Sequence, residues 1–344
     1  MPRSNIKAII AMSGGVDSSV VAALLKRADF DVTGVFMKLY DSSEFRKAER
    51  KAKEIAKFLK ISFLTLDFKK EFEKEVIDYF LREYKKGKTP NPCIKCNQEI
   101  KFGIFLKKAM ELDADYIATG HYAQTKNNKL LKAKDKEKDQ TYFLYNLKQS
   151  QLKKILFPIG NFTKVEIRKI AKDIGIASLV RPESKDICFL KGKYQNFLKK
   201  YLKLKPGPIL DISGKKIGEH QGLFLYTIGQ RKEIRIAGLK PYYVLKLDFK
   251  RNTLIVTDNE KDLYKKELIA EKVNWISGKK PKMPLKIKAK IRYLHPADSA
   301  IISSSVKTQN CYRIIFTIPQ RAITPGQSVV FYKGKEILGG GIIK

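Results

Sequence analysis

The sequence is poor in cysteine, histidine and tryptophan, with four, three and one of each in 344 residues. So few cysteines cannot build the disulfide framework of a secreted protein. No apolar run is long enough to span a bilayer. The apolar stretch 6–25 is broken by two glycines and Asp17, and no small-residue cleavage site follows it. We therefore expect a cytoplasmic protein without a membrane segment.

Acidic residues are scarce as well. There are 35 Asp and Glu against 70 Lys and Arg, a formal net charge of +35. Such a surplus favours a polyanionic partner through steering and counterion release. The lysines are scattered rather than clustered, however, and a general bias toward lysine would give the same count. Charge alone does not decide between a nucleic-acid partner and a solvated surface.

A phosphate-binding Gly-Lys-Ser/Thr sequence is missing, which excludes the P-loop of kinases and GTPases. In its place, residues 13–19 read Ser-Gly-Gly-Val-Asp-Ser-Ser between two apolar runs. This pattern predicts a strand, a glycine turn and the start of a helix, whose free N–H groups can bind a pyrophosphate. The segment resembles the signature of the ATP pyrophosphatases, which cleave ATP to AMP and pyrophosphate. The alternative is a plain strand–turn–helix in which the glycines serve only the turn.

The first half of the chain alternates between strand and helix patterns. Strands are expected at 6–12, 32–37, 62–67 and 116–119, and helices at 18–27, 45–59 and 72–84. The alternation predicts a parallel sheet covered by helices on both faces. Ligands bind such sheets at the carboxyl ends of the strands. The glycine turn, Met37 and Gly120 all fall at such ends.

The pattern changes at Pro206-Gly207-Pro208. Short strands are then expected at 242–248, 253–257, 285–291, 300–306, 312–317, 328–332 and 337–342, which suggests a small barrel. We predict an α/β catalytic domain over 1–205, a small connecting domain over 206–265 and a β-barrel over 266–344.

Cys93 and Cys96 form a Cys-x-x-Cys pair within residues 87–97, where Pro90 and Pro92 predict a stiff, extended loop. A structural zinc ion needs four ligands. No second cysteine pair exists and the three histidines are isolated, so the sequence argues against a closed zinc site. A redox dithiol or part of a cluster site remains open.

Cys188 lies 92 residues beyond Cys96, so only folding could bring the two together. Arg181 and Lys185 would lower the pKa of a nearby thiol, as in activated cysteine nucleophiles. The alternative is a buried structural cysteine packed between apolar neighbours. Cys311 matches no motif, and we interpret it as structural at the start of a strand.

Taken together, these segments resemble the bacterial tRNA-specific 2-thiouridylases. The resemblance rests on residues 13–19, 87–97, 119–123, 138–144, 158–160, 183–189, 226–232 and 321–327. That family consists of tRNA-uridine 2-sulfurtransferases, which replace O2 of uridine 34 with sulfur in the tRNAs for Lys, Glu and Gln. It implies an ATP-pyrophosphatase (adenine nucleotide alpha hydrolase-like) domain, a connecting domain and a tRNA-binding β-barrel.

The resemblance also implies roles for individual residues. Cys188 would carry a persulfide and Cys96 would assist it. ATP would contact Ala11, Met12, Ser13, Gly14, Gly15, Val16, Asp17, Ser18, Met37 and Gly120. The target base would contact Asn91, Pro92 and Cys93. The rest of the tRNA would contact His121, Lys138, Asp139, Gln140, Arg292, Tyr293 and Gln327. ATP, Mg²⁺, tRNA and a sulfur donor (a cysteine desulfurase, a relay protein or free sulfide) would be the partners.

The sequence departs from the family pattern at three places. Many members have Asp where this chain has Cys93, so Cys93, Cys96 and Cys188 could instead ligate three irons of a [4Fe–4S] cluster. The family usually reads Gly-Leu-Gly where Glu233 to Arg235 stand, and a cysteine-bearing insert near 41–44 is absent.

Two other functions have to be weighed. Argininosuccinate, GMP and NAD synthetases share the glycine turn but adenylate small molecules, and they need neither the cysteine pair nor a basic barrel. A non-catalytic RNA-binding module would bind tRNA without releasing pyrophosphate.

Overall fold

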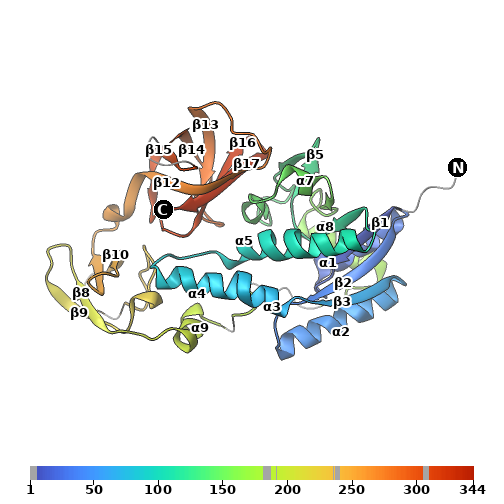
Figure 1. Cartoon of the computed structure of the whole chain (residues 1–344), viewed down its shortest axis with the longest axis horizontal. Helices are drawn as coiled ribbons and strands as arrows, with labels where there is room; N and C mark the ends of the chain where they lie inside the picture. Colours follow the sequence, from blue (N-terminus) through green and yellow to red (C-terminus); the bar gives the residue numbers. More distant parts are fainter. Residues whose placement is uncertain (1–5, 181–186, 191, 235, 237–240, 305–309) are drawn as a thin grey trace.

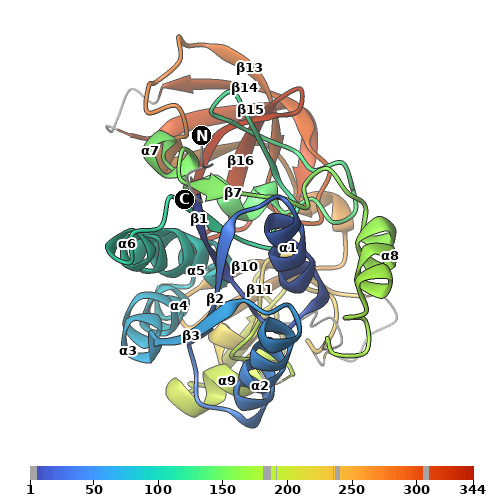
Figure 2. The same ribbon diagram turned by 90° about the vertical axis from the view of Figure 1, so that its right-hand side faces the viewer.

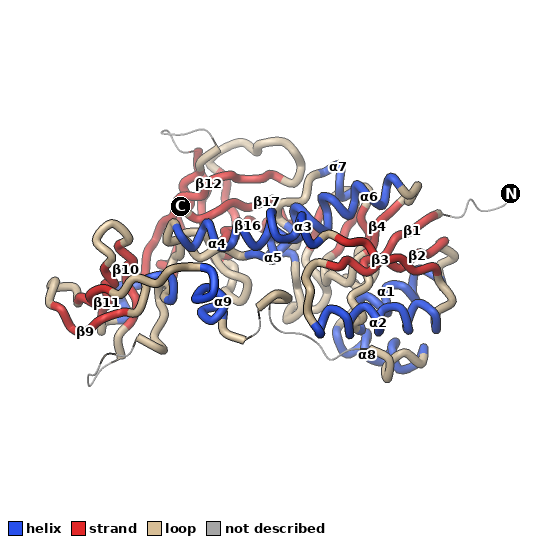
Figure 3. The backbone as a smooth tube through the Cα atoms, turned by 60° about the horizontal axis from the view of Figure 1, so that its bottom comes forward, coloured by secondary structure: helices blue, strands red, loops and turns tan. Residues whose placement is uncertain are grey.

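The computed structural model describes residues 6–180, 187–190, 192–234, 236, 241–304 and 310–344. These residues form three β-sheets of five, four and eight strands. In Figure 1 the five-stranded sheet lies on the right and the eight-stranded sheet above the centre; the four-stranded sheet lies at the lower left. The tube in Figure 3 shows the same elongated arrangement from another side.

The first sheet is parallel throughout and has the order β3-β2-β1-β4-β7. Its strands are β1 (Lys7–Ala11), β2 (Asp31–Lys38), β3 (Ser62–Asp67), β4 (Tyr116–Ala118) and β7 (Ile155–Leu156). The expected parallel sheet is confirmed, and β7 is an edge strand that the sequence did not reveal. The chain order reverses between β1 and β4, which is where such sheets bind their ligands.

Helices cover both faces of this sheet (Figure 2). Ala8 and Ile10 of β1 point to one face, whereas Ile9 points to the other, as expected of alternating strand residues. The first face packs on α1 (Val16–Arg27), α2 (Ser43–Phe58) and α8 (Lys164–Ile174). The other face packs on α3 (Lys69–Phe72), α4 (Asp78–Lys85), α5 (Pro92–Cys96) and α6 (Phe105–Glu111).

Two of these helical rods contain π-helical turns. The segment η1 (Glu73–Ile77) joins α3 to α4, and η2 (Asn97–Ile104) joins α5 to α6. The extended loop predicted around the Cys-x-x-Cys pair is therefore wrong from residue 92 onward. Pro92 occupies the first helical position, where a missing N–H costs nothing. The Asn91 side chain caps the helix by accepting from the N–H groups of Cys93 (3.0 Å) and Ile94 (3.3 Å).

The four-stranded sheet follows the predicted boundary near residue 206. Its order is β10-β11-β8-β9, with β8 (Gly207–Leu210), β9 (Lys216–His220), β10 (Tyr243–Asp248) and β11 (Thr253–Thr257). Ile209, Val244 and Leu254 form its core. The short helices α9 (Tyr194–Tyr201) and η5 (Glu260–Leu263) precede and follow it in sequence, and η4 (Leu223–Leu225) lies between β9 and β10.

The last sheet closes into an antiparallel six-stranded barrel because β12 pairs with both β15 and β17. The barrel strands are β12 (Tyr264–Trp275), β13 (Leu285–Lys290), β14 (Asp298–Ser304), β15 (Tyr312–Arg321), β16 (Ser328–Lys333) and β17 (Glu336–Ile343). The predicted fold class is confirmed, although the sequence did not reveal β12, the strand that closes the barrel. Cys311 lies just before β15 rather than within it.

The barrel docks on the first domain. A hairpin of that domain, β5 (Gln124–Lys126) and β6 (Lys129–Leu131), extends the barrel sheet alongside β17. The Tyr142 hydroxyl, in η3 (Thr141–Leu144), donates to the Ser328 carbonyl at 2.9 Å. Helix α7 (Gln149–Leu152) completes the domain. Among the described residues, no helix combines the length and the apolar character that crossing a membrane requires.

Candidate functional site

A tight turn at residues 13–15 and the first residues of α1, 16–18, lie at the switch point of the parallel sheet. We call residues 13–18 the nucleotide loop. Gly14 has φ of +72°, and a side chain there would meet the Ala48 carbonyl at 2.7 Å. The Ser18 hydroxyl accepts from the Ser13 N–H at 3.1 Å and donates to the Gly15 carbonyl at 3.1 Å. These bonds fix the turn ahead of α1, whose first N–H groups lack helical partners and suit an anion.

Gly120 brings the end of β4 against this loop. A Cβ at Gly120 would lie 2.9 Å from the Ser18 nitrogen and 3.1 Å from the Asp17 Cβ. Met37 is half-buried near the end of β2, and Met12 is buried, so Met12 can offer a nucleotide only its backbone. Ala11 ends β1 at the same edge. The structure thus brings together the residues expected to contact ATP.

The carboxylate of Asp17 has partners that the sequence did not point to. Lys164, the first residue of α8, places its Nζ 2.7 Å from each Asp17 oxygen. The Tyr122 hydroxyl donates to Asp17 Oδ1 at 2.8 Å. Lys164 is 6% exposed. The Thr163-x-x-Glu166 capping box marks this helix start in the sequence, but nothing there links Lys164 to a loop 147 residues away.

The three cysteines expected at the site, which we call the thiol site, gather in one region. Cys93 and Cys96 lie in α5, and Cys188 follows residues outside the described part of the chain. Burial, with a smaller contribution from Cys93, raises the pKa of Cys96 to about 11. Burial also raises the pKa of Cys93 and that of Cys188. The Cys188 side chain is exposed on one side, but the protein around its sulfur and the other two thiols oppose its ionisation.

One cation acts on the whole thiol site. Lys101, in η2, lowers the pKa of Cys93, Cys96 and Cys188 against the effect of burial. It also adds to the burial that holds the pKa of His121 well below its usual range. His121 is therefore neutral at physiological pH, and its Nδ1 lies 2.8 Å from the Thr119 hydroxyl. The predicted activation by Arg181 and Lys185 falls on residues outside the described ranges.

His121 connects the thiol site to the nucleotide loop. It follows Gly120, which touches the loop, and its ring packs on Phe102 with centroids 5.7 Å apart. Phe102 belongs to η2, the continuation of the helix that carries Cys93 and Cys96. Two contacts, Gly120 with the loop and His121 with Phe102, therefore connect the nucleotide loop to the helix that carries Cys93 and Cys96.

The thiol chemistry would suit an iron–sulfur cluster, but the placement does not. Within the described ranges, no three His, Cys, Asp or Glu side chains are close enough together to hold a metal ion. The described cysteines are all free thiols. We therefore derive no step through a cluster.

The residues expected to contact tRNA lie in two groups. Asp139 accepts from the Thr141 hydroxyl at 2.9 Å, and the Gln140 side chain accepts from the Tyr122 N–H at 3.0 Å. Tyr293 packs on Phe143 with ring centroids 4.4 Å apart, and Arg292 donates to the Arg321 carbonyl at 2.9 Å. Lys138 is half-buried beside the first group, and His121 is buried.

Four aromatic and polar positions illustrate the structural alternative. Tyr142 and Tyr226 are buried core residues, and Phe143 packs against the core from its edge. Glu233 has φ of +67° and pairs with Lys193, whereas Arg235 lies outside the described residues.

Gln327 has a structural bond that the resemblance did not imply. Its Nε2 donates to the Thr89 carbonyl at 2.7 Å, and the Thr89 N–H donates to the Pro325 carbonyl at 2.8 Å. Both bonds tie the barrel to the segment that precedes α5. Gln327 thus helps to position the helix of the thiol site.

Replacing Gln327 with alanine should therefore lower the stability of the folded protein, in addition to removing any contact of this side chain with tRNA. We expect the free energy of unfolding to fall by about 1 kcal/mol, the value of one hydrogen bond, measured by denaturant titration. Gln221→Ala is the matched control, because Gln221 is exposed and makes no hydrogen bond among the described residues. Equal stability of the two variants would contradict the expectation.

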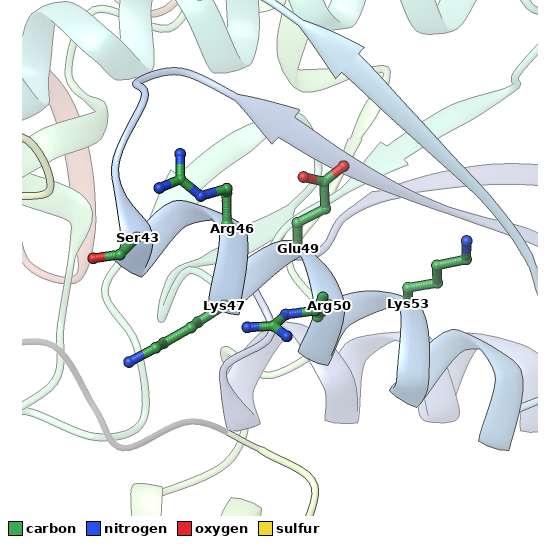
Figure 4. Close-up of a pocket in the computed structure, with 6 residues that line it drawn as sticks. All are labelled: Ser43, Arg46, Lys47, Glu49, Arg50 and Lys53. Carbon is green, nitrogen blue, oxygen red and sulfur yellow. The ribbon is translucent and has the colours of Figure 1, made fainter.

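A pocket lies along α2 (Figure 4). It is lined by Ser43, Arg46, Lys47, Glu49, Arg50 and Lys53. These side chains include four cations, one carboxylate and one hydroxyl. The pocket adds to the basic surface.

Comparisons with known proteins cover the whole fold. The family described as "tRNA methyl transferase HUP domain" matches residues 6–192. The "tRNA methyl transferase PRC-barrel domain" matches 195–258, and the "Aminomethyltransferase beta-barrel domain" matches 265–343. A solved U34-tRNA thiolase NcsA from Methanococcus maripaludis, described with its [4Fe–4S] cluster, is 17% identical. It covers 58% of this chain and 64% of its own at a TM-score of 0.38, too remote to carry an argument.

Curated relatives are much closer and match over their full length. The tRNA-specific 2-thiouridylase MnmA of Halothermothrix orenii is 48% identical over 98% of this chain and 99% of its own. The proteins of the same name from Buchnera aphidicola subsp. Schizaphis graminum and Clostridioides difficile are 47% and 45% identical. The first match spans 100% of this chain and the second 99%, and each spans 98% of the relative's own length. The chain therefore belongs to the tRNA-specific 2-thiouridylases, the tRNA-uridine 2-sulfurtransferases that carry out tRNA 2-thiolation.

Proposed function

We propose that this enzyme thiolates C2 of uridine 34 in the tRNAs for Lys, Glu and Gln, using ATP to activate the base and a persulfide on Cys188 to deliver the sulfur. The observation that carries the proposal is the link between the nucleotide loop and the thiol site through Gly120, His121 and Phe102. A base held between them could be activated on one side and attacked from the other.

ATP is the first substrate. Its pyrophosphate would bind the N–H groups of the nucleotide loop, near Met37 and Gly120 at the same sheet edge. The uridine O2 attacks the α-phosphate, pyrophosphate leaves, and the oxygen becomes part of an AMP leaving group. Mg²⁺ would neutralise charge on the departing pyrophosphate. Asp17 is the carboxylate of the loop that could ligate Mg²⁺, although in this structure it accepts hydrogen bonds from Lys164 and Tyr122.

Sulfur transfer would use two cysteines. The terminal sulfur of the Cys188 persulfide attacks C2, the C2–O bond breaks and AMP leaves. The Cys96 thiol then gives up its proton and its sulfur attacks Sγ of Cys188, which forms a Cys96–Cys188 disulfide and releases 2-thiouridine. A thiol reductant must open this disulfide, and a sulfur donor must reload Cys188 before the next turnover.

Water would compete with sulfur at the activated carbon, so the base has to leave its loop and enter a shielded site. Asn91, Pro92 and Cys93 are the residues that we assign to the base. Asn91 is held by its cap bonds to α5, and Pro92 is buried behind it. Because the imidazole of His121 is neutral, it does not attract the phosphates by charge. We assign it a role as a hydrogen-bonding group.

The deciding experiment is thiolation of unmodified tRNA. Protein purified anaerobically and assayed for iron is incubated with tRNA, ATP and a persulfide donor, and 2-thiouridine and pyrophosphate are measured. We expect ATP-dependent 2-thiouridine from iron-free protein. Turnover of small acids without tRNA would favour a synthetase, and tRNA binding without pyrophosphate release would favour a binding module. Activity that appears only with bound iron would favour the cluster route.

A further inference from the structure

The nucleotide loop carries no positive side chain of its own. Residues 11–19 contain neither lysine nor arginine, whereas a triphosphate brings several negative charges. The start of α1 supplies only about half an elementary charge from its aligned peptide groups. A cation from elsewhere in the chain would complete the site.

Lys164 is such a cation. Its Nζ lies 2.7 Å from both oxygens of Asp17, which is the second residue of α1. The ring of Tyr122 lies 5.8 Å from the same Nζ. The Asp17 side chain is 26% exposed and that of Lys164 7%. The ammonium group is therefore buried next to a carboxylate that is partly exposed to solvent, beside the anion-binding turn.

A purely structural role explains this arrangement poorly. Moving an ammonium group out of water is costly, and a buried ion pair is often no more stabilising than apolar side chains of the same volume. Apolar residues could join α1 to α8 equally well, since Val20 of α1 and Ile167 of α8 already pack in one core. A lysine buried beside an anion-binding turn is better explained by a ligand.

We propose that Lys164 is a ligand of the β- and γ-phosphates of ATP, held ready by Asp17 until the nucleotide arrives. The inference rests on the proposed use of ATP. Phosphate oxygens and the carboxylate compete for one ammonium group, and the Tyr122 hydroxyl continues to hold Asp17 when Lys164 turns to the phosphates. A remote helix thus provides the cation that a Gly-Lys-Ser/Thr loop carries within its own sequence.

The test is nucleotide binding by the full-length Lys164→Met variant, measured calorimetrically without tRNA. The probes are α,β-methylene-ATP, inorganic pyrophosphate and AMP. Methionine keeps an unbranched side chain, one atom shorter than that of lysine, and removes its charge. We expect affinity for the ATP analogue and for pyrophosphate to fall about 10- to 100-fold, the value of a lost charge-assisted hydrogen bond. Affinity for AMP should stay within about twofold of wild type.

Lys169→Met is the matched control, because Lys169 is an exposed lysine of the same helix. Lys164→Arg should keep most of the affinity. If Lys164→Met fails to fold, Lys164→Gln takes its place, because glutamine removes the charge and can still donate a hydrogen bond to Asp17. Unchanged affinity for the ATP analogue, or an equal loss for ATP analogue and AMP, would overturn the inference alone. A wild-type protein that binds no ATP analogue would overturn the proposed use of ATP as well.

Discussion

Replacing Cys188 with serine is expected to abolish 2-thiouridine formation, lowering the rate by about 10³-fold or more, as the loss of a nucleophile does. A serine hydroxyl cannot carry a persulfide, so no sulfur reaches C2 even when the base is activated. The measurement is mass spectrometry of nucleosides from tRNA that has been incubated with ATP and a sulfur donor.

Two controls make this result specific to sulfur transfer. Cys311→Ser changes a half-buried cysteine that makes no contact with the thiol site in the described structure, and it should leave the rate unchanged. The Cys188→Ser variant should still bind ATP, because the nucleotide loop is built from residues 13–18 and their neighbours. A serine variant that thiolates tRNA at the normal rate would remove the persulfide step from the mechanism.

The parallel sheet and its ligand edge could be predicted because local signals determine them. The apolar run before residue 13, the two glycines and the apolar run after residue 19 each specify a strand, a turn or a helix within a few residues. Parallel strands all end at one edge of the sheet, so the loop could be placed at that edge. Met37 and Gly120 reach the same edge for the same reason. The strand order that makes the edge a switch point came only from the structure.

The partners of Asp17 could not be predicted, because they depend on packing between distant segments. Lys164 belongs to a helix whose start is visible from its capping box, but its contact with α1 follows from how both helices lie on the sheet. The role of Gln327 likewise depends on how the barrel docks on Thr89. Such contacts join residues far apart in sequence, and periodicity says nothing about them.

The helical start at Pro92 was missed for a different reason. Two prolines close together favour an extended chain, whereas Asn91 followed by Pro92 is a typical N-cap and first helical residue. Closure of the barrel was missed because β12 has lysines and glutamates on its exposed side and lacks a clear alternation at its start. In both places the sequence contains a local signal for the observed element, but a stronger neighbouring pattern points to a different structure.

Alkylation of Cys96 by iodoacetamide is expected to be very slow at neutral pH and to rise about tenfold for each pH unit up to about pH 10. The thiolate is the reactive form, and burial raises the pKa of Cys96 to about 11. At pH 7 only about one thiol in 10⁴ is then ionised, whereas a free thiol with a pKa near 8.5 is a few per cent ionised. The measurement is the rate of Cys96 modification across pH 6–11, followed by peptide mass spectrometry on iron-free protein.

Lys101→Met tests the cause of this pH dependence. The ammonium group of Lys101 lowers the pKa of Cys96, so its removal should raise that pKa and slow alkylation further at every pH below 10. Lys107→Met is the control, because Lys107 is an exposed lysine two residues into α6 on the same helical rod. A Cys96 that reacts at pH 7 as fast as a cysteine peptide would show that the thiol is not buried in solution. Equal rates in the two lysine variants would show instead that Lys101 does not act on it.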